Sequence, residues 1–314
     1  MLKASAINIL DLQAEQVNSW LQSFDTIISD CDATLWHDDT AIEGAADVLN
    51  ALQTRAGKRV YLITNNGLKT RHELLQRAER LNFQLPDETH IISPTQTIVD
   101  YLRQLKTFDS TRHSVYVVGN AAIARELNEA GIKSFGAGKA EKLEQDDRWE
   151  EFVQREFGQS AAAVANVGAV VVGWDEYFSY CKIARACHIL CSNPDCAFLV
   201  TNKDAVHKYP NVCIPGTGAF VASIEACAER MATEMGKPNP LVLQPLLDAD
   251  VLQPIRTLMI GDCCKIDVTF ARNCNLQSLL VGTGSYQLET LRENPHLPMP
   301  DFYLPTLGSL LPYI

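Results

Sequence analysis

The sequence SDCDATLW at residues 29–36 places two carboxylates, Asp30 and Asp32, directly after an apolar run at residues 24–28. The apolar run predicts a buried strand, and the polar residues that follow it predict the end of that strand. Two carboxylates one residue apart repel each other, and the end of a buried strand is an unfavourable place for them. The pair therefore indicates a bound cation, a chemical reaction or simple exposure in a turn.

Other short runs rich in β-branched residues end near Gly, Asn or Asp. They lie at residues 59–65, 114–119, 169–174, 197–202, 257–262 and 278–282. Segments with helical spacing of apolar residues lie between them, at residues 45–56, 71–81, 95–105, 121–130, 177–190, 220–232 and 239–247. This alternation predicts an α/β fold with a parallel sheet buried on both faces. The charged stretch 138–159 is expected to be a surface excursion or an exposed helix.

The composition is that of a globular protein with one large or two medium domains. The 314 residues are 46% apolar and 21% charged, and the formal net charge is −11. An acidic chain without a Lys/Arg cluster is not expected to bind nucleic acid or an anionic membrane surface. No apolar run is long enough to span a bilayer, and the first twenty residues lack the apolar block of a signal peptide. We therefore expect a cytoplasmic protein whose ten cysteines are thiols.

Ligands of open α/β sheets bind beyond the carboxyl ends of the strands, so polar residues at these ends are candidates for a site. The candidates that follow a predicted strand or precede a predicted helix are Asp30, Asp32, Thr64, Asn65, Asn66, Lys237, Asp262 and Asp267. Asp30 and Asp262 can supply the one or two carboxylates that Mg²⁺ requires.

These residue types also suit phosphoryl transfer. Asp30 can act as a nucleophile that forms an aspartyl-phosphate, and Asp32 is near enough to protonate the leaving oxygen and later to activate water. Thr64 and the amides after it can hold phosphate oxygens, while Lys237 can stabilise the developing phosphoryl charge. Taken singly, each motif is also an ordinary turn sequence. Their occurrence together, each at a strand end or helix start, favours one shared site.

The four segments resemble the motifs of the haloacid dehalogenase superfamily of phosphohydrolases. Residues 30–34 (DCDAT) match its D-x-D-x-T/V signature, and Thr64, Lys237 and the pair Asp262 and Asp267 match its second, third and fourth motifs. TNNGLKTR at 64–71, GKPNP at 236–240 and TLMIGDCCKIDV at 257–268 are similar to the phosphoglycolate and pyridoxal-phosphate phosphatase branch. This branch is the 4-nitrophenylphosphatase-like group that includes chronophin, and the resemblance covers nearly the whole chain.

The resemblance implies a Rossmann-like parallel-sheet core at residues 1–100 and 232–314, with an inserted α/β cap at residues 101–231 that determines substrate specificity. It also implies a Mg²⁺-dependent phosphomonoesterase that hydrolyses a small phosphorylated metabolite, phosphoglycolate-like or pyridoxal phosphate-like, through an aspartyl-phosphate. Relatives of this kind are often homodimers through the cap, so a homodimer is expected here.

The resemblance also implies roles for individual residues. Asp30 would be the nucleophile and a Mg²⁺ ligand, Asp32 the general acid/base whose backbone carbonyl also binds Mg²⁺, and Asp262 a third ligand supported by Asp267. The residues implied to bind substrate are Thr64, Asn65, Asn66 and Lys237, together with His207, which falls about where pyridoxal-phosphate phosphatases have a substrate-reading histidine.

The chain departs from the branch at several places. Ala33 replaces the usual Gly and would be strained if its φ were positive. Residues 263–265 also differ, so the local support of Asp262 is expected to differ. The cap loop 202–215 differs as well, and because the cap is expected to determine the substrate, the substrate stays open. Cys31, between the two aspartates, predicts redox-sensitive activity, although the adjacent carboxylates should raise the pKa of its thiol and slow oxidation. Asp175, Tyr180 and Lys182 are expected to pack within the cap.

Two other functions remain open. Phosphorylation-sensing receiver domains also combine strand-end aspartates, a threonine and a lysine, but they are far shorter and lack a cap. A catalytically degenerate family member that acts as a binding or scaffold protein is the main alternative to an enzyme, and Ala33 is one reason to consider it.

Overall fold

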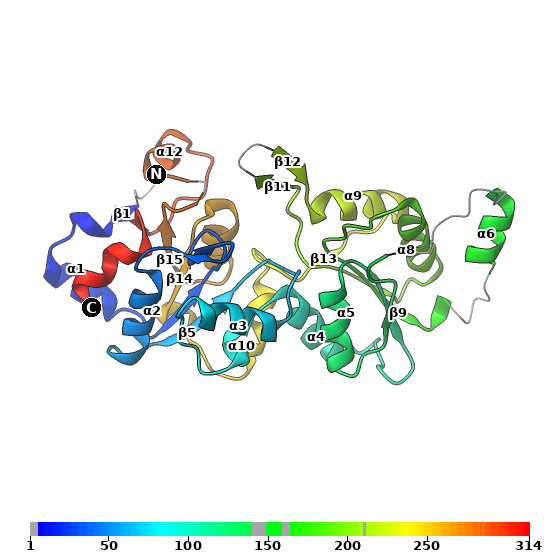
Figure 1. The fold of residues 1–314 in the computed structure, drawn as a ribbon, viewed down its shortest axis with the longest axis horizontal. Helices are drawn as coiled ribbons and strands as arrows, with labels where there is room; N and C mark the ends of the chain where they lie inside the picture. The colour runs from blue at the N-terminus through cyan, green and yellow to red at the C-terminus, as the bar shows by residue number, and fades with distance from the viewer. Residues whose placement is uncertain (1–5, 140–148, 159–163, 210–211, 285) are drawn as a thin grey trace. The chain divides into compact units, whose positions relative to one another are not determined.

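The structure is a computed structural model that describes residues 6–139, 149–158, 164–209, 212–284 and 286–314. The chain divides into two units (Figure 1). We call Met1–Thr64, Arg71–Ile92 and Lys237–Ile314 the core unit, and Asn65–Thr70 and Ser93–Gly236 the cap unit. The cap unit is thus inserted into the sequence of the core unit.

The core unit is built on a seven-stranded sheet of strand order β1-β16-β15-β14-β2-β5-β6, in which every pairing is parallel. Its strands are β1 (Ile7–Asn8), β2 (Thr26–Ser29), β5 (Arg59–Ile63), β6 (Ile91–Ile92), β14 (Thr257–Gly261), β15 (Gln277–Val281) and β16 (Phe302–Leu304). Because β2 pairs with β5 on one side and with β14 on the other, the strand order reverses at β2. Ligands of such sheets bind at this switch point, beyond the carboxyl ends of the strands.

Helices cover both faces of the core sheet. Ile27 packs in one apolar cluster with α1 and α2, whereas its neighbour Ile28 packs in another with η3 and α11. The helices of this unit are α1 (Ala14–Leu21), α2 (Ala45–Thr54), α3 (Arg71–Arg80), α10 (Gln244–Asp248), α11 (Thr269–Asn273) and α12 (Leu288–Glu293). Its shorter turns are η1 (Ile9–Asp11), η2 (Glu88–His90), η3 (Pro240–Leu243), η4 (Pro254–Arg256), the π-helical turn η5 (Cys264–Val268) and η6 (Leu307–Tyr313). A small antiparallel hairpin, β3 (Trp36–His37) and β4 (Thr40–Ala41), follows β2.

The cap unit contains a second parallel sheet, of order β13-β10-β9-β7-β8. Its strands are β7 (Ser114–Val118), β8 (Ser134–Phe135), β9 (Val167–Val172), β10 (Ala197–Val200) and β13 (Thr233–Glu234), and β11 (Val206–Tyr209) and β12 (Val212–Pro215) form an antiparallel hairpin. The helices are α4 (Pro94–Gln104), α5 (Ala121–Glu129), α6 (Trp149–Phe157), α8 (Tyr180–Ser192) and α9 (Thr217–Ala228). Val170 packs with α8 and α9, whereas Val171 packs with α4 and α5, so the cap sheet is also covered on both faces.

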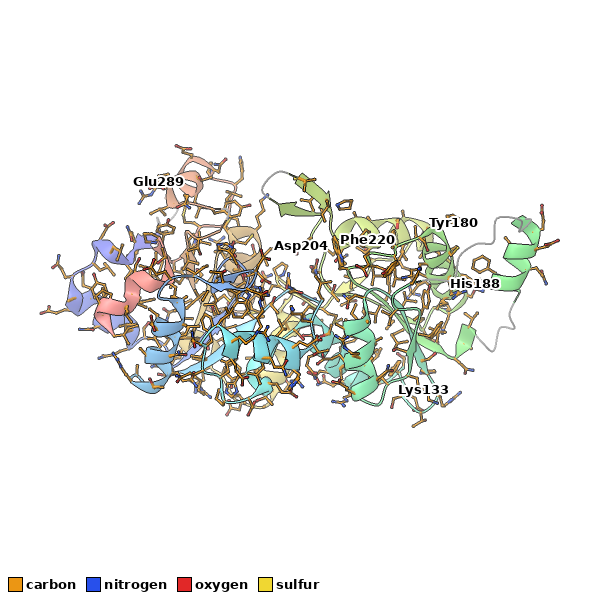
Figure 2. All side chains as sticks on the ribbon, viewed as in Figure 1. Lys133, Tyr180, His188, Asp204, Phe220 and Glu289 are labelled. Atoms are coloured by element: carbon orange, nitrogen blue, oxygen red, sulfur yellow. The ribbon has the colours of Figure 1, made fainter. Side chains whose placement is uncertain are left out.

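Two interactions hold the start of α8 in the cap. Phe178 stacks on Phe220 of α9 at a centroid distance of 4.5 Å, where Figure 2 labels Phe220. Lys182 of α8 forms a buried ion pair with Asp175. The expected packing role of Asp175 and Lys182 agrees with these contacts, but Tyr180 is 56% exposed and contributes little to the interior.

The predicted strands and most of the predicted helices are present, with ends shifted by a few residues. The helix predicted at residues 239–247 is instead the 3-10 turn η3 followed by the short helix α10. The predicted cap, residues 101–231, lies within the longer segment of the cap unit, Ser93–Gly236, and the cap unit also includes Asn65–Thr70. Ile98 and Leu102 of α4 pack in the apolar cluster of the cap sheet, and Thr233 of β13 pairs with Leu199 of β10. Of the charged stretch 138–159, residues 149–157 form helix α6, and residues 140–148 and 159 lie outside the described part of the chain. No helix among the described residues is long and apolar enough to cross a membrane.

Candidate active site

Three carboxylates of the core unit converge at the switch point of the sheet. Asp30 follows β2, Asp262 follows β14, and Asp267 lies in the turn η5. One oxygen from each of them lies within 4.8 Å of the others, and all three residues are buried. The two strands are neighbours in the sheet, which is why residues 232 positions apart in the chain meet here (262 − 30).

Two glycines let the backbone approach these carboxylates. A Cβ at Gly284 would lie 1.8 Å from Oδ2 of Asp262, and a Cβ at Gly261 would lie 2.2 Å from Cγ of Asp267. Both distances are far below a van der Waals contact, so a side chain at either position would displace a carboxylate. The surrounding backbone therefore cradles the carboxylate cluster.

Lys237 supplies a positive charge to this cluster. Its Nζ lies 2.5 Å from Oδ1 of Asp30 and 2.7 Å from Oδ1 of Asp267, and its side chain is only 2% exposed. Burial alone would lower the pKa of Lys237, but the carboxylates of Asp267 and Asp30 more than reverse this effect and raise it. The lysine is therefore a fixed ammonium ion.

Thr34 connects the two strand ends from inside the turn that follows β2. Its Oγ1 donates to Oδ2 of Asp30 at 3.2 Å and lies 3.4 Å from Oδ1 of Asp262. The turn is closed by the amide of Leu35, which donates to the carbonyl of Cys31 at 2.8 Å. Ala33 adopts a φ of 63°, in the left-handed region that favours glycine, so the strain predicted for an alanine at this position is present.

The cluster carries more negative than positive charge. Burial is the main factor that raises the pKa of Asp30, and burial together with the charges of Asp30 and Asp267 raises the pKa of Asp262 to about 8. Three carboxylates around one ammonium leave two uncompensated negative charges when all are ionised. The oxygen donors, their proximity and this excess charge fit a hard divalent cation such as Mg²⁺.

Asp32 is held in different surroundings from the three buried carboxylates. Its side chain is 46% exposed, and its Oδ1 accepts a hydrogen bond from Nε1 of Trp36 at 3.0 Å. The guanidinium group of Arg77 lies 3.4 Å from the same oxygen. One aspartate of the DxD pair thus points into the carboxylate cluster while the other lies at its rim.

The other predicted site residues lie at the end of β5 or in the cap unit. Thr64 is buried at the end of β5, where its amide donates to the carbonyl of Ile92 at 3.1 Å. Asn65 and Asn66 belong to the cap unit, where the carbonyl of Asn65 accepts from Asn202 at 3.1 Å and Oδ1 of Asn66 accepts from the amide of Leu68 at 2.9 Å. His207 lies in β11, but its side chain is outside the described part of the structure.

Two cysteines lie next to the aspartates. Cys31 is 2% exposed, and burial together with the charges of Asp30 and Asp32 raises the pKa of its thiol well above the usual value. This disfavours the reactive thiolate and argues against the redox sensitivity predicted from the sequence. The backbone amide of Cys263 donates to Oδ2 of Asp267 at 3.0 Å. Because the donor is the backbone, the unusual side chain at position 263 does not remove this hydrogen bond.

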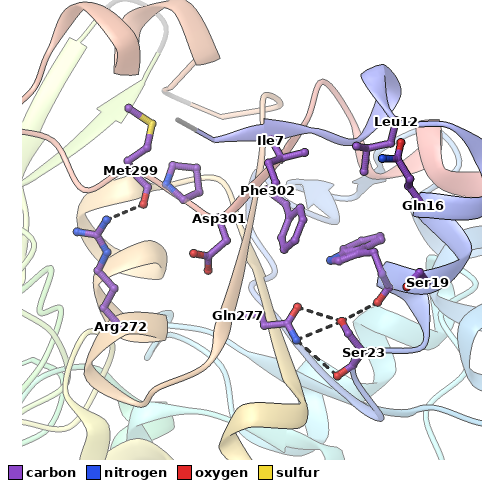
Figure 3. Close-up of a pocket in the computed structure, with 12 residues that line it drawn as sticks. Ile7, Leu12, Gln16, Ser19, Ser23, Arg272, Gln277, Met299, Asp301 and Phe302 are labelled. Carbon is purple, nitrogen blue, oxygen red and sulfur yellow. Dashed lines mark hydrogen bonds between the residues drawn. The ribbon is translucent and has the colours of Figure 1, made fainter. Parts of the chain in front are cut away.

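A separate open groove of about 720 Å³ lies near the β1 edge of the core unit (Figure 3). Its lining includes Ile7, Trp20 and Phe302, with the amide of Gln277 bonded to Ser23 at 3.2 Å. None of the predicted site residues is among the described residues that line it. The groove is therefore distinct from the carboxylate cluster.

Comparison with known proteins identifies the family of this chain. A family model described as haloacid dehalogenase-like hydrolase matches residues 27–133, and a second HAD-hydrolase-like model matches residues 234–310. Glycerol-3-phosphate phosphatase of Gallus gallus is 33% identical over 311 residues, which cover 96% of this chain and 95% of that protein. The chain belongs to the haloacid dehalogenase-like hydrolase family. The phosphatases among its relatives further identify it as a phosphatase.

Other members of the family match along most of the chain. Chronophin of Homo sapiens is 31% identical over 290 residues, which cover 90% of this chain and 91% of that protein. Among solved structures, a 4-nitrophenylphosphatase from Thermotoga maritima has a TM-score of 0.73 at 22% identity, covering 93% of this chain and 98% of that one. A glycerol phosphate phosphatase from Mycobacterium tuberculosis, solved in complex with magnesium, has a TM-score of 0.71 at 21% identity, with coverages of 92% and 77%. These structures share the α/β fold described above.

Sequence reasoning did not assign roles to two residues of this candidate site, Thr34 and Arg77. Thr34 was part of a recognised motif, but its contact with two carboxylates depends on the pairing of β2 with β14. Arg77 had a detectable signal, because it falls on the buried face of helix α3 together with Leu74 and Ala78. A charged residue in such a position is rarely buried without a partner.

Proposed function

We propose that this phosphatase is a Mg²⁺-dependent phosphomonoesterase that hydrolyses a small phosphorylated metabolite through an aspartyl-phosphate on Asp30. The observation that carries the proposal is the buried Asp30 carboxylate, whose two oxygens contact Lys237 and Thr34 at the switch point of the sheet. A carboxylate fixed in this way, beside further carboxylates and one ammonium, suits nucleophilic attack on a phosphate ester.

The proposed Mg²⁺ site uses the side chains of Asp30 and Asp262 and the backbone carbonyl of Asp32, with Asp267 in support. All of these donors are oxygens, as this cation prefers. Bound Mg²⁺ supplies positive charge that counters the negative charge of the phosphate and the carboxylates. Asp267 also accepts from Lys237, so it would hold the lysine as well as support the cation.

The proposed reaction has two steps. In the first, an oxygen of Asp30 forms a bond to phosphorus and the ester P–O bond breaks; its electron pair leaves with the ester oxygen, which takes a proton from Asp32. In the second, water gives a proton to Asp32 and its oxygen attacks phosphorus, so that the bond to Asp30 breaks and phosphate is released. Lys237, Thr64, Asn65 and Asn66 are proposed to bind the phosphoryl group during both steps.

The substrate is proposed to be a small ester such as glycerol 3-phosphate, phosphoglycolate or pyridoxal 5′-phosphate. Relatives that are 30–33% identical are named glycerol-3-phosphate phosphatase, chronophin and phosphoglycolate phosphatase. His207 of the cap hairpin is proposed to read the part of the substrate beyond the phosphate. A homodimer through the cap and a cytoplasmic location complete the proposal.

Phosphate release from a panel of these esters, with Mg²⁺ and with EDTA, tests the proposal. We expect turnover with Mg²⁺ that is lost in EDTA and lost in Asp30→Asn, a variant of nearly the same size that cannot form the aspartyl-phosphate. Turnover that persists in folded Asp30→Asn would contradict the nucleophile assignment. A folded wild type without turnover on any ester would instead support the degenerate binding or scaffold protein.

A further inference from the structure

Arg77 is a buried charged residue to which the proposed mechanism assigns no role. Its side chain is only 6% exposed, although it lies on helix α3 among apolar residues such as Leu74. Burying a guanidinium group is unfavourable unless it is paired and hydrogen-bonded. Its burial therefore has to be explained by its contacts.

The contacts of Arg77 all lead to the segment that carries Asp32. The guanidinium group contacts Oδ1 of Asp32 at 3.4 Å and lies 5.2 Å from the centre of the Trp36 ring. In the β3–β4 hairpin it donates to the backbone carbonyl of Asp38 and lies 3.8 Å from Oδ1 of Asp39. Trp36 is 1% exposed and packs edge-on against Phe83 at 5.5 Å, which fixes its indole. Arg77 thus joins helix α3 to the hairpin and to Asp32.

Nε1 of Trp36 and the guanidinium group of Arg77 reach the same carboxylate oxygen of Asp32. Nε1 of Trp36 lies 3.0 Å from Oδ1, and the guanidinium group of Arg77 lies 3.4 Å from it. Both donors belong to buried side chains, whereas the Asp32 side chain is 46% exposed. Two buried, rigid donors restrict the rotamers of a partly exposed carboxylate, which would otherwise rotate in solvent.

We propose that Arg77, together with Trp36, is a positioning residue that holds the Asp32 carboxylate in the orientation for proton transfer to the leaving oxygen. This inference rests on the proposed function, in which Asp32 is the general acid/base. A positioned acid contributes about 10²- to 10⁴-fold to such steps, and a carboxylate free to rotate loses part of that contribution.

The choice of substrate separates positioning of an acid from a general structural role. In the first step, an alkyl ester such as glycerol 3-phosphate releases a strongly basic oxygen that needs the proton of Asp32. 4-Nitrophenyl phosphate releases a weakly basic phenolate that departs without it. Both substrates form the same aspartyl-phosphate, so its hydrolysis cannot distinguish them. The value of kcat/KM depends only on the events up to the first irreversible step and therefore does not include this hydrolysis.

The experiment compares kcat/KM for the two substrates in Arg77→Met, Arg77→Lys and Trp36→Phe. Arg80→Met is the matched control, since Arg80 is an exposed arginine on the same helix. In Arg77→Met we expect kcat/KM for glycerol 3-phosphate to fall about 10- to 100-fold and that for 4-nitrophenyl phosphate to fall less than about threefold. Arg77→Lys should recover part of the loss, and Arg80→Met should match the wild type.

Each other outcome has a definite meaning. An equal fall for both substrates, or no fall, would overturn the positioning role of Arg77. Should Arg77→Met fail to fold, Trp36→Phe decides, because it removes the N–H donor to Asp32 and keeps a buried aromatic ring, although a smaller one; the same unequal fall is expected. Failure of the proposed function is seen separately, as a wild type that releases no phosphate from either substrate or as an Asp30→Asn variant that remains active. Either result would overturn this inference with it.

Discussion

The ammonium group of Lys237 lies between the carboxylates of Asp30 and Asp267, 2.5 Å from the first and 2.7 Å from the second. The three side chains are buried, and they come from the end of β2, from a loop before η3 and from the turn η5. One ammonium group therefore contacts two acids that the fold brings together. Removing that cation leaves both acids buried without it, which is costly.

Lys237→Met is expected to lower turnover at least about 100-fold, because the transferred phosphoryl group loses a preorganised positive charge. The metal-free variant should also be about 3–5 kcal/mol less stable, since two carboxylates stay buried. Phosphate release and urea unfolding in EDTA measure the two effects. Lys265→Met is the control, because Lys265 is exposed two residues from Asp267; equal effects in both variants would contradict the assignment.

Ala33→Gly is expected to stabilise the protein by about 0.5–1 kcal/mol. The φ of 63° at Ala33 strains the backbone of alanine but not that of glycine. Removing this strain is expected to outweigh the greater chain entropy that glycine has in the unfolded state. Urea unfolding measures the change. Ala46→Gly in helix α2 should shift stability in the opposite direction, by about 1 kcal/mol. A loss of stability in both variants would show that Ala33 is not strained.

Without metal, the protein should lose stability as the pH rises from about 4 to about 8. Burial and the neighbouring acids raise the pKa of Asp262 to about 8, from an ordinary value of 3.8. Within this range the folded protein binds more protons than the unfolded chain, so deprotonation favours unfolding. Melting temperatures in EDTA at a series of pH values measure the loss.

Mg²⁺ should reduce this loss, because it binds the ionised carboxylates of the folded protein. The difference in melting temperature between Mg²⁺ and EDTA is therefore expected to increase up to about pH 8. Asp262→Asn removes the titrating carboxyl group, so the difference in melting temperature should change less with pH. A difference that is the same at pH 5 and at pH 8 would argue against a metal site at these residues.

Lys182→Met is expected to destabilise the cap unit by about 3–5 kcal/mol, because Asp175 would remain buried without its ion-pair partner. Asp175 also accepts from the amide of Tyr177 at 2.9 Å, so its charge cannot easily move to solvent. Thermal unfolding measures the effect, with Lys133→Met, an exposed lysine of the cap labelled in Figure 2, as the control. The double variant with Asp175→Asn should recover much of the loss; additive losses would contradict the pairing.

The position of the carboxylate cluster could be predicted because the strands that lead to it are long enough to be recognised. Asp30, Thr64 and Asp262 each follow a run of four or five strand residues, and parallel strands bring their carboxyl ends to one edge. Lys237 was a candidate because it precedes a predicted helix, since the strand before it, β13, has two residues and no detectable periodicity.

The features that the sequence did not predict depend on partners distant in the chain. The boundary at Ser93 follows from the packing of α4 on the cap sheet, which periodicity within α4 cannot reveal. Likewise, the helical pattern around Arg77 predicts a buried position without naming Asp32 as the acid it contacts. Substrate recognition in the cap stays a proposal for the same reason.

The pairing of β2 with β14 has a consequence for synthesis of the chain. Ile27 and Leu258 are neighbours in the sheet, yet the entire cap is translated between them. The cap sheet is formed from one continuous segment and can fold as it leaves the ribosome, whereas one edge of β2 has to wait for its partner. An unpaired apolar edge is a site of aggregation. The strand that leads to the proposed nucleophile is therefore also a part of the nascent chain that needs protection by chaperones until β14 has been made.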